Sequence, residues 1–155
     1  VAVFLWSAFT IGVPFLSKQL AFNLPFFEKI GDDFGHFETM DSIHFTESQL
    51  SISRQEELRN FFEGYSTLPN IKVYFRKAKK PGFSNNVFAF PGRSIVFTDS
   101  FIELADSDHE LLAVFFHEEG HIANRHFTRQ VIQASVLNAV LFLLFVSLCF
   151  FSLNS

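Results

Sequence analysis

The residues of this chain whose chemistry stands out are two histidines with a glutamate beside the first. They form the pattern H-E-x-x-H from His117 to His121, in a stretch that has the sequence pattern of a helix. Histidines four positions apart lie on one face of an α-helix, one turn apart. Both imidazoles can then reach one Zn²⁺ at about 2.0–2.1 Å, while Glu118 can activate water at the metal. The pattern predicts a zinc site; two histidines that merely share a helical face are the alternative.

The motif requires a helix, and the residues before it contain a start signal. Ser107 and Glu110 have the spacing of a capping box, in which a serine caps the helix and a glutamate reaches back. Apolar residues fill most of the following positions, so the histidines are polar exceptions, as at a satisfied polar site. Gly120 costs a helix about 1 kcal/mol relative to alanine. We expect a neighbouring element to approach closely there, unless the glycine is simply tolerated.

The composition limits the class of protein. The chain has 155 residues, enough for one domain of ordinary size, and its 48% hydrophobic content with 24 Phe is high for a soluble protein. All Lys, Arg, Asp and Glu residues fall between Lys18 and Arg129, and the net charge is −4. We therefore expect no nucleic-acid partner, because no basic patch is present. A lone cysteine, Cys149, excludes a disulfide within the chain.

Both ends of the chain are apolar. Val1–Leu16 predicts part of a transmembrane helix, with the hydrophobic region of a signal peptide as the alternative. Val136–Leu153 predicts a membrane helix; the alternative is a buried core helix, because Asn138 would face lipid poorly. We expect a partial transmembrane segment over 1–17, a central domain that contains the H-E-x-x-H pattern over 18–135 and a membrane helix over 136–153. The first residue is Val1 rather than Met, so we expect a piece of a longer protein.

Between these ends the sequence predicts an α+β fold. A helix is expected between Phe45 and Gly64, with start signals at Thr46 and Ser53. The other expected elements are a strand over Ile71–Arg76, a hairpin of Val87–Phe90 and Ser94–Phe97 around Pro91–Arg93, and a helix that starts at Ser100.

A zinc site needs a further protein ligand. The metzincin pattern would supply a third histidine after a glycine, but Asn124 occupies the glycine position. On a continuous helix His126 would lie about 180° from His117, so we expect it to face away from the metal. The third ligand should be a carboxylate from a later helix, and none follows Glu119, so we expect it beyond the end of the chain. Upstream carboxylates that could substitute are Glu103 and Glu110.

Two stretches resemble one family. The segment from His117 to His126 resembles the H-E-x-x-H-x-x-x-R-H pattern of metallopeptidase family forty-eight, the membrane-associated zinc endopeptidases of the HtpX, CAAX prenyl endopeptidase and mitochondrial quality-control types. Asn86–Gly92 is similar to the family's N-A-F-A-x-P-G-G stretch. The chain differs at Val87, Arg93 and Glu119, where the family has Ala, Gly and an apolar residue.

The resemblance implies that residues 18–135 are part of a metallopeptidase domain. That domain would be zincin-like, truncated and of α+β class, with a small sheet packed on the motif helix and flanking apolar, membrane-embedded helices. It implies a gluzincin with one Zn²⁺ per subunit, a glutamate as third ligand from a later segment, and an inactive fragment if that ligand is missing. The expected metal ligands are His117 and His121, and the expected general base is Glu118. An edge strand would bind substrate through Asn86, Val87, Phe88 and Ala89. Arg125 and His126 would orient the ligands or pack against the site. Simple sheet pairing is the alternative for the edge strand.

We therefore expect a membrane-associated zinc metalloendopeptidase that cleaves protein or peptide substrates in protein quality control or processing. Its partners would be these substrates and membrane lipid, and its location a membrane, expected to be that of a bacterial cell. The competing hypothesis is a non-catalytic, membrane-anchored adaptor or structural protein with a vestigial metal motif.

Overall fold

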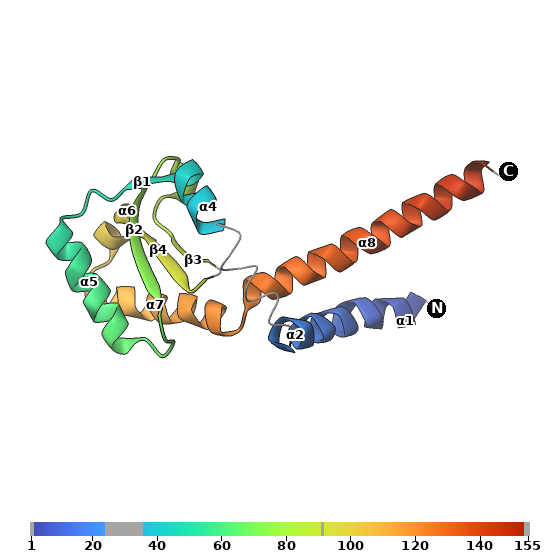
Figure 1. Ribbon diagram of the computed structural model, residues 1–155, viewed down its shortest axis with the longest axis horizontal. Helices are drawn as coiled ribbons and strands as arrows, with labels where there is room; N and C mark the ends of the chain where they lie inside the picture. The colour runs from blue at the N-terminus through green and yellow to red at the C-terminus, as the bar shows by residue number, and fades with distance from the viewer. Residues whose placement is uncertain (1, 24–35, 91, 154–155) are drawn as a thin grey trace. The chain divides into compact units, whose positions relative to one another are not determined.

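The computed structural model describes residues 2–23, 36–90 and 92–153, so the predictions that involve Val1 and Pro91 lie outside the described residues. The chain divides into two compact units. One unit, Phe26–His126, contains the sheet and the H-E-x-x-H motif; the other combines Val1–Pro25 with Phe127–Ser155. The first unit is α+β, as the sequence predicts (Figure 1).

A four-stranded mixed sheet organises the first unit, with the strand order β1-β2-β4-β3. β2 and β4 are parallel, whereas β1 and β3 run antiparallel to their neighbours. The predicted hairpin of β3 and β4 is confirmed, and β3 lies at one edge of the sheet. The strands are β1 (Phe45–Glu47), β2 (Lys72–Ala78), β3 (Val87–Phe90) and β4 (Ser94–Thr98).

Helices flank this sheet. They are α4 (His36–His44), α5 (Ile52–Tyr65), α6 (Asp99–Leu104) and α7 (Asp108–Ala123), with a short 3₁₀ turn, η2 (Pro81–Phe83). α5, α6 and α7 contribute to one hydrophobic core with the sheet. The ring of Phe62 on α5 stacks between Phe97 of β4 and Phe115 of α7, at centroid distances of 4.9 and 5.1 Å. Phe37 of α4 stacks on Tyr74 instead, with the centroids 4.3 Å apart. Successive side chains along β2 point to opposite faces of the sheet. Tyr74 therefore lies on the face away from the hydrophobic core, and α4 packs on that face.

The prediction of a helix start at Thr46 is wrong. Phe45–Glu47 forms β1, which pairs with β2, and the Phe45 side chain is buried. The helix begins only at Ile52, where the Ser51 side chain accepts a hydrogen bond from the backbone N–H of Arg54. A capping pattern is therefore overridden where sheet pairing and burial of an aromatic side chain favour a strand.

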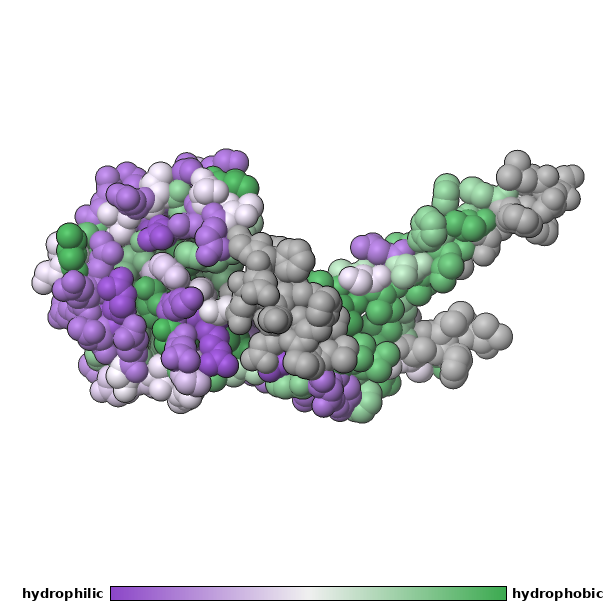
Figure 2. All heavy atoms as spheres, viewed as in Figure 1, coloured by the Kyte–Doolittle hydropathy of each residue, from purple (hydrophilic) through white to green (hydrophobic). Residues whose placement is uncertain are grey.

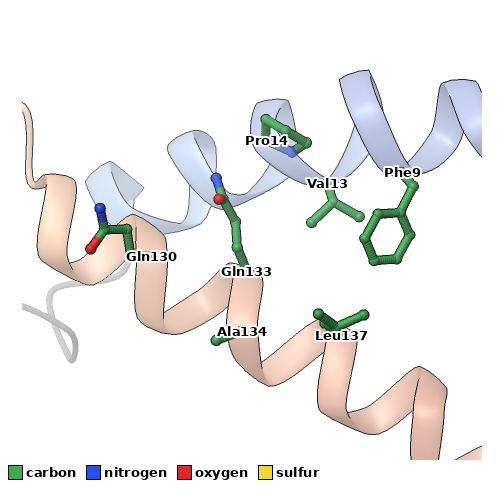
Figure 3. Close-up of a pocket in the computed structure, with 7 residues that line it drawn as sticks. All are labelled: Phe9, Val13, Pro14, Gln130, Gln133, Ala134 and Leu137. Atoms are coloured by element: carbon green, nitrogen blue, oxygen red, sulfur yellow. The ribbon is translucent and has the colours of Figure 1, made fainter.

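The second unit consists of helices: α1 (Ala2–Ser7), the π-helical η1 (Ala8–Gly12), α2 (Val13–Asn23) and α8 (His126–Leu153). Gln133 Nε2 of α8 donates to the buried Ser17 Oγ of α2 over 2.9 Å. Beside this contact is an open, mostly apolar groove of about 320 Å³ (Figure 3). Phe9, Val13, Pro14, Gln130, Gln133, Ala134 and Leu137 line it. Within the described parts of the chain, no helix combines the length and apolarity that a membrane crossing requires.

Candidate metal centre

The helix that carries the motif begins where the sequence predicts. Ser107 caps α7, and its Oγ accepts a 3.4 Å hydrogen bond from the backbone N–H of Glu110. The Glu110 carboxylate accepts from the backbone N–H of Asp106 over 3.0 Å, one residue before the capping serine. Glu110 is thus occupied at the start of the helix, two turns before the histidines. Leu111 and Phe115 anchor α7 in the core.

The two histidines of the motif converge. His117 Nε2 and His121 Nε2 are 3.1 Å apart, and their rings meet at 81°. Two nitrogens bound to one tetrahedral zinc at 2.0–2.1 Å would be separated by about 3.3 Å, so this pair fits the metal. His117, Glu118 and His121 place one ligand atom each within 4.8 Å of one another. Among the described residues this group is the one able to hold a metal, and neither Glu103 nor Glu110 belongs to it.

Glu118 lies against the edge strand. The backbone N–H of Ala89 donates a hydrogen bond to its carboxylate. Burial raises the pKa of Glu118 above the usual range for glutamate, while the charges of His121 and His117 and the Ala89 hydrogen bond act in the lowering direction. A carboxylate that is reluctant to stay ionised is a better proton acceptor near neutral pH than an exposed one. This glutamate therefore has the environment of a general base.

The hydrogen-bond direction of β3 follows from its neighbours. Asn86, just before β3, pairs with Thr98: its carbonyl accepts from the backbone N–H of Thr98 and its N–H donates to Thr98 Oγ1. Bonding alternates along an antiparallel ladder, so Phe88 and Phe90 turn their backbone groups toward β4. The backbone N–H and C=O groups of Val87 and Ala89 then point to the outer edge of the sheet.

The outward N–H groups of β3 both have side-chain acceptors. The N–H of Val87 donates to Asn86 Oδ1 over 2.9 Å, and that of Ala89 donates to Glu118. Of the four predicted substrate-binding residues, Val87 and Ala89 therefore present backbone carbonyls at the edge next to Glu118. Asn86 secures the start of the strand, and the ring of Phe88 packs against Phe45 at 5.6 Å.

The prediction that His126 faces away from the site is wrong, because the helix does not continue. α7 ends at Ala123, Asn124 is its C-cap, and Arg125 takes a left-handed conformation with φ 49°. The regular helix is interrupted at this point, and His126 Nδ1 lies 2.6 Å from His121 Nδ1. Asparagine is a common residue at helix ends, so Asn124 was the available sequence signal for this break.

A buried carboxylate next to the site was missed by sequence reasoning. Glu119 accepts hydrogen bonds from Ser66 Oγ, from the backbone N–H and Oγ1 of Thr67 (both 2.9 Å) and from the backbone N–H of Leu68 (3.2 Å). Burial acts to raise its pKa, but these hydrogen bonds together lower the pKa below the usual range. Glu119 therefore ties the loop after α5 to α7.

The structure also corrects the expectation at Gly120. A β-carbon added there would meet no atom of a neighbouring element within 4 Å among the described residues, so no such element requires a glycine. Arg93, in contrast, has a φ of 60°, which is the left-handed conformation that glycine adopts most easily. The difference from the family pattern at this turn therefore places an arginine in a glycine-like conformation.

One of three comparisons with known proteins gave a match. Neither the comparison with curated proteins nor that with solved structures gave a match. The model of Peptidase family M48 matches residues 54–155, which include β2, β3, β4 and the whole of α7. The match covers more than half of the chain and contains the converging histidines. The chain therefore belongs to peptidase family M48.

Proposed function

We propose that this protein is a zinc-dependent metalloendopeptidase whose site consists of His117, Glu118 and His121. The observation that carries the proposal is the 3.1 Å approach of the two Nε2 atoms beside a glutamate that is held by an edge strand. His117 and His121 would hold the ion. Zinc bound there supplies Lewis-acid polarisation of a carbonyl oxygen and activation of water.

Glu118 would carry out the proton transfers. Its carboxylate takes a proton from the attacking water and passes it to the leaving amine, as expected for a base whose ionised form is disfavoured by burial. The Ala89 backbone acts on the same carboxylate from β3 and favours its ionised form, which is the form that accepts a proton.

The open edge of β3 would bind an extended substrate. Peptides add to a sheet edge through main-chain hydrogen bonds, and Val87 and Ala89 turn their carbonyl groups to this edge. Their N–H groups are engaged by Asn86 and Glu118. The substrate should therefore contribute mainly N–H donors at alternate residues, so the proposed substrate class is an unfolded or extended protein segment.

The helical unit would bring the peptidase to a membrane, where we place its role in protein quality control or processing. Large apolar side chains are exposed along it, and in Figure 2 the coloured part of α8 is mostly hydrophobic. Such a surface binds lipid or detergent through burial of apolar area. Among the α8 side chains that the structure describes, Phe142, Leu143 and Phe145 are the most exposed of the large apolar ones. Serine at these positions should weaken co-flotation with phospholipid vesicles; equal flotation of the variant and the original protein would contradict membrane binding.

The catalytic proposal is tested with the complete protein and an unstructured substrate such as casein. Glu118→Gln should abolish hydrolysis and leave zinc bound, because Glu118 acts as a base rather than as a ligand. Glu63→Gln, the same change at an exposed position on α5, is the matched control and should keep full activity. Chelation should stop hydrolysis and added zinc restore it. A Glu118→Gln protein that still cleaves casein, or a complete protein that is inert with zinc bound, would favour a non-catalytic adaptor instead.

A further inference from the structure

His121 has polar contacts at both ends of its ring. Its Nε2 lies 3.1 Å from His117 Nε2, on the side of the candidate metal centre. Its Nδ1 lies 2.6 Å from His126 Nδ1, and the two rings meet at 71°. The imidazole of His121 is therefore positioned between a candidate metal site and a second imidazole.

The backbone is shaped to return His126 to this place. Asn124 closes α7 twice, with its backbone N–H and its Nδ2 both donating to the carbonyl of Gly120, at 3.0 and 2.8 Å. Arg125 then adopts φ 49°, a left-handed conformation that is unfavourable for a residue other than glycine. Such a conformation persists where its surroundings hold it. The turn that results brings His126 beside His121 rather than to the far side of the helix.

The position of one proton follows from this arrangement. Two imidazole nitrogens 2.6 Å apart form a hydrogen bond only if one donates and the other accepts. A histidine that binds a metal through Nε2 carries its proton on Nδ1. If His126 were the donor, the proton of neutral His121 would lie on Nε2, where it would point at His117 and at the metal. Zinc binding is compatible only with donation from His121 to His126.

We propose that His126 Nδ1 accepts the Nδ1–H of His121 and thereby fixes the tautomer and ring orientation in which His121 binds zinc. This inference rests on the proposed zinc site. His126 is a positioning residue here rather than a ligand: its Nδ1 is directed at His121, and among the described residues it lies outside the group whose ligand atoms converge. Groups that support a metal-bound histidine in this way affect metal affinity by about 10–100-fold.

Two substitutions of matched shape separate this role from packing. In His126→Asn the amide oxygen takes the place of Nδ1 and can still accept, whereas His126→Leu has the same branching without an acceptor. We expect zinc affinity of the complete protein, measured by competition with a chromophoric chelator, to fall about 10–100-fold in His126→Leu. His126→Asn should stay within about threefold of the original, and unfolding of the two zinc-free variants should be alike. Equal zinc affinity in the two variants would overturn the proposal.

A second measurement needs no variant, so misfolding cannot obscure the result. Nitrogen-15 NMR of the zinc-free protein at mildly alkaline pH, where imidazoles are neutral, should show His121 protonated on Nδ1 and His126 on Nε2. A His121 ring protonated on Nε2 would overturn the proposal. A complete protein without measurable zinc affinity would overturn the metal site itself, whereas undiminished affinity in His126→Leu would overturn the role of His126 alone.

Discussion

Glu119→Leu should strongly destabilise the fold, although it replaces a buried charged side chain with an apolar one. The carboxylate is buried and accepts four hydrogen bonds from Ser66, Thr67 and Leu68. A hydrogen bond to a charged group contributes about 1.5–3 kcal/mol, but Thr67 is exposed, so water can replace part of what is lost. We therefore expect a loss of about 3 kcal/mol of unfolding free energy rather than the sum of four contacts.

The measurement is thermal unfolding followed by far-ultraviolet circular dichroism. For a chain of this size, about 3 kcal/mol corresponds to a fall in Tm of about 6–12 °C. Glu119→Gln is the matched control: it keeps the shape and one acceptor oxygen, and should cost about 1 kcal/mol. A Glu119→Leu protein as stable as the original would refute the reasoning, since it would mean that the loop after α5 is held in place by other contacts.

Three further outcomes are expected. Gly120→Ala should raise unfolding stability by about 0.5–1 kcal/mol in denaturant titration, because open space surrounds the added methyl group; destabilisation would contradict this. Because Val87 and Ala89 present carbonyls at the edge, N-methylation of alternate residues of a peptide substrate should raise KM about 2–10-fold. N-methylation of the intervening residues should leave KM unchanged. An equal rise in KM for both sets of peptides would contradict the proposed pairing with β3. Hydrogen bonding to Arg54 lowers the pKa of Asp108, so the pair stabilises the fold above the ordinary aspartate pKa and loses its effect as pH falls through the lowered value. Asp108→Asn should therefore lower the unfolding free energy near neutral pH, by no more than about 1 kcal/mol for this partly exposed pair. In strong acid the substitution should have little effect. A variant that is less stable than the original by the same amount at both pH values would contradict the linkage.

Features of the sequence that depend on local chemistry were predictable. Ser107 was identified as the cap of α7, the β3–β4 hairpin was expected from its turn, and the spacing of His117 and His121 placed both imidazoles on one face. Each of these follows from residues less than about twelve positions apart. The prediction of β3 beside the site came from the family resemblance rather than from periodicity.

Features that depend on distant contacts were not predictable. Glu119 bonds to residues more than fifty positions earlier, so nothing near it in the sequence marks it as buried and satisfied. Phe45 reads as the approach to a helix, yet it pairs with Ala78 in the sheet. His126 was misplaced for a local reason: helical periodicity was extended through Asn124, where the chain has a cap and a left-handed residue. Periodicity places side chains only as far as the helix continues.

The central claim, that His117 and His121 together hold a zinc ion, is tested most directly by zinc-edge X-ray absorption spectroscopy of the zinc-loaded complete protein. The account predicts scattering from two imidazole rings with nitrogen at about 2.0–2.1 Å and from oxygen ligands in the remaining positions. It also predicts that the two imidazole signals fall to one in either His117→Ala or His121→Ala and remain at two in His126→Asn. A spectrum with three imidazoles, with sulfur, or with no imidazole at all would contradict it.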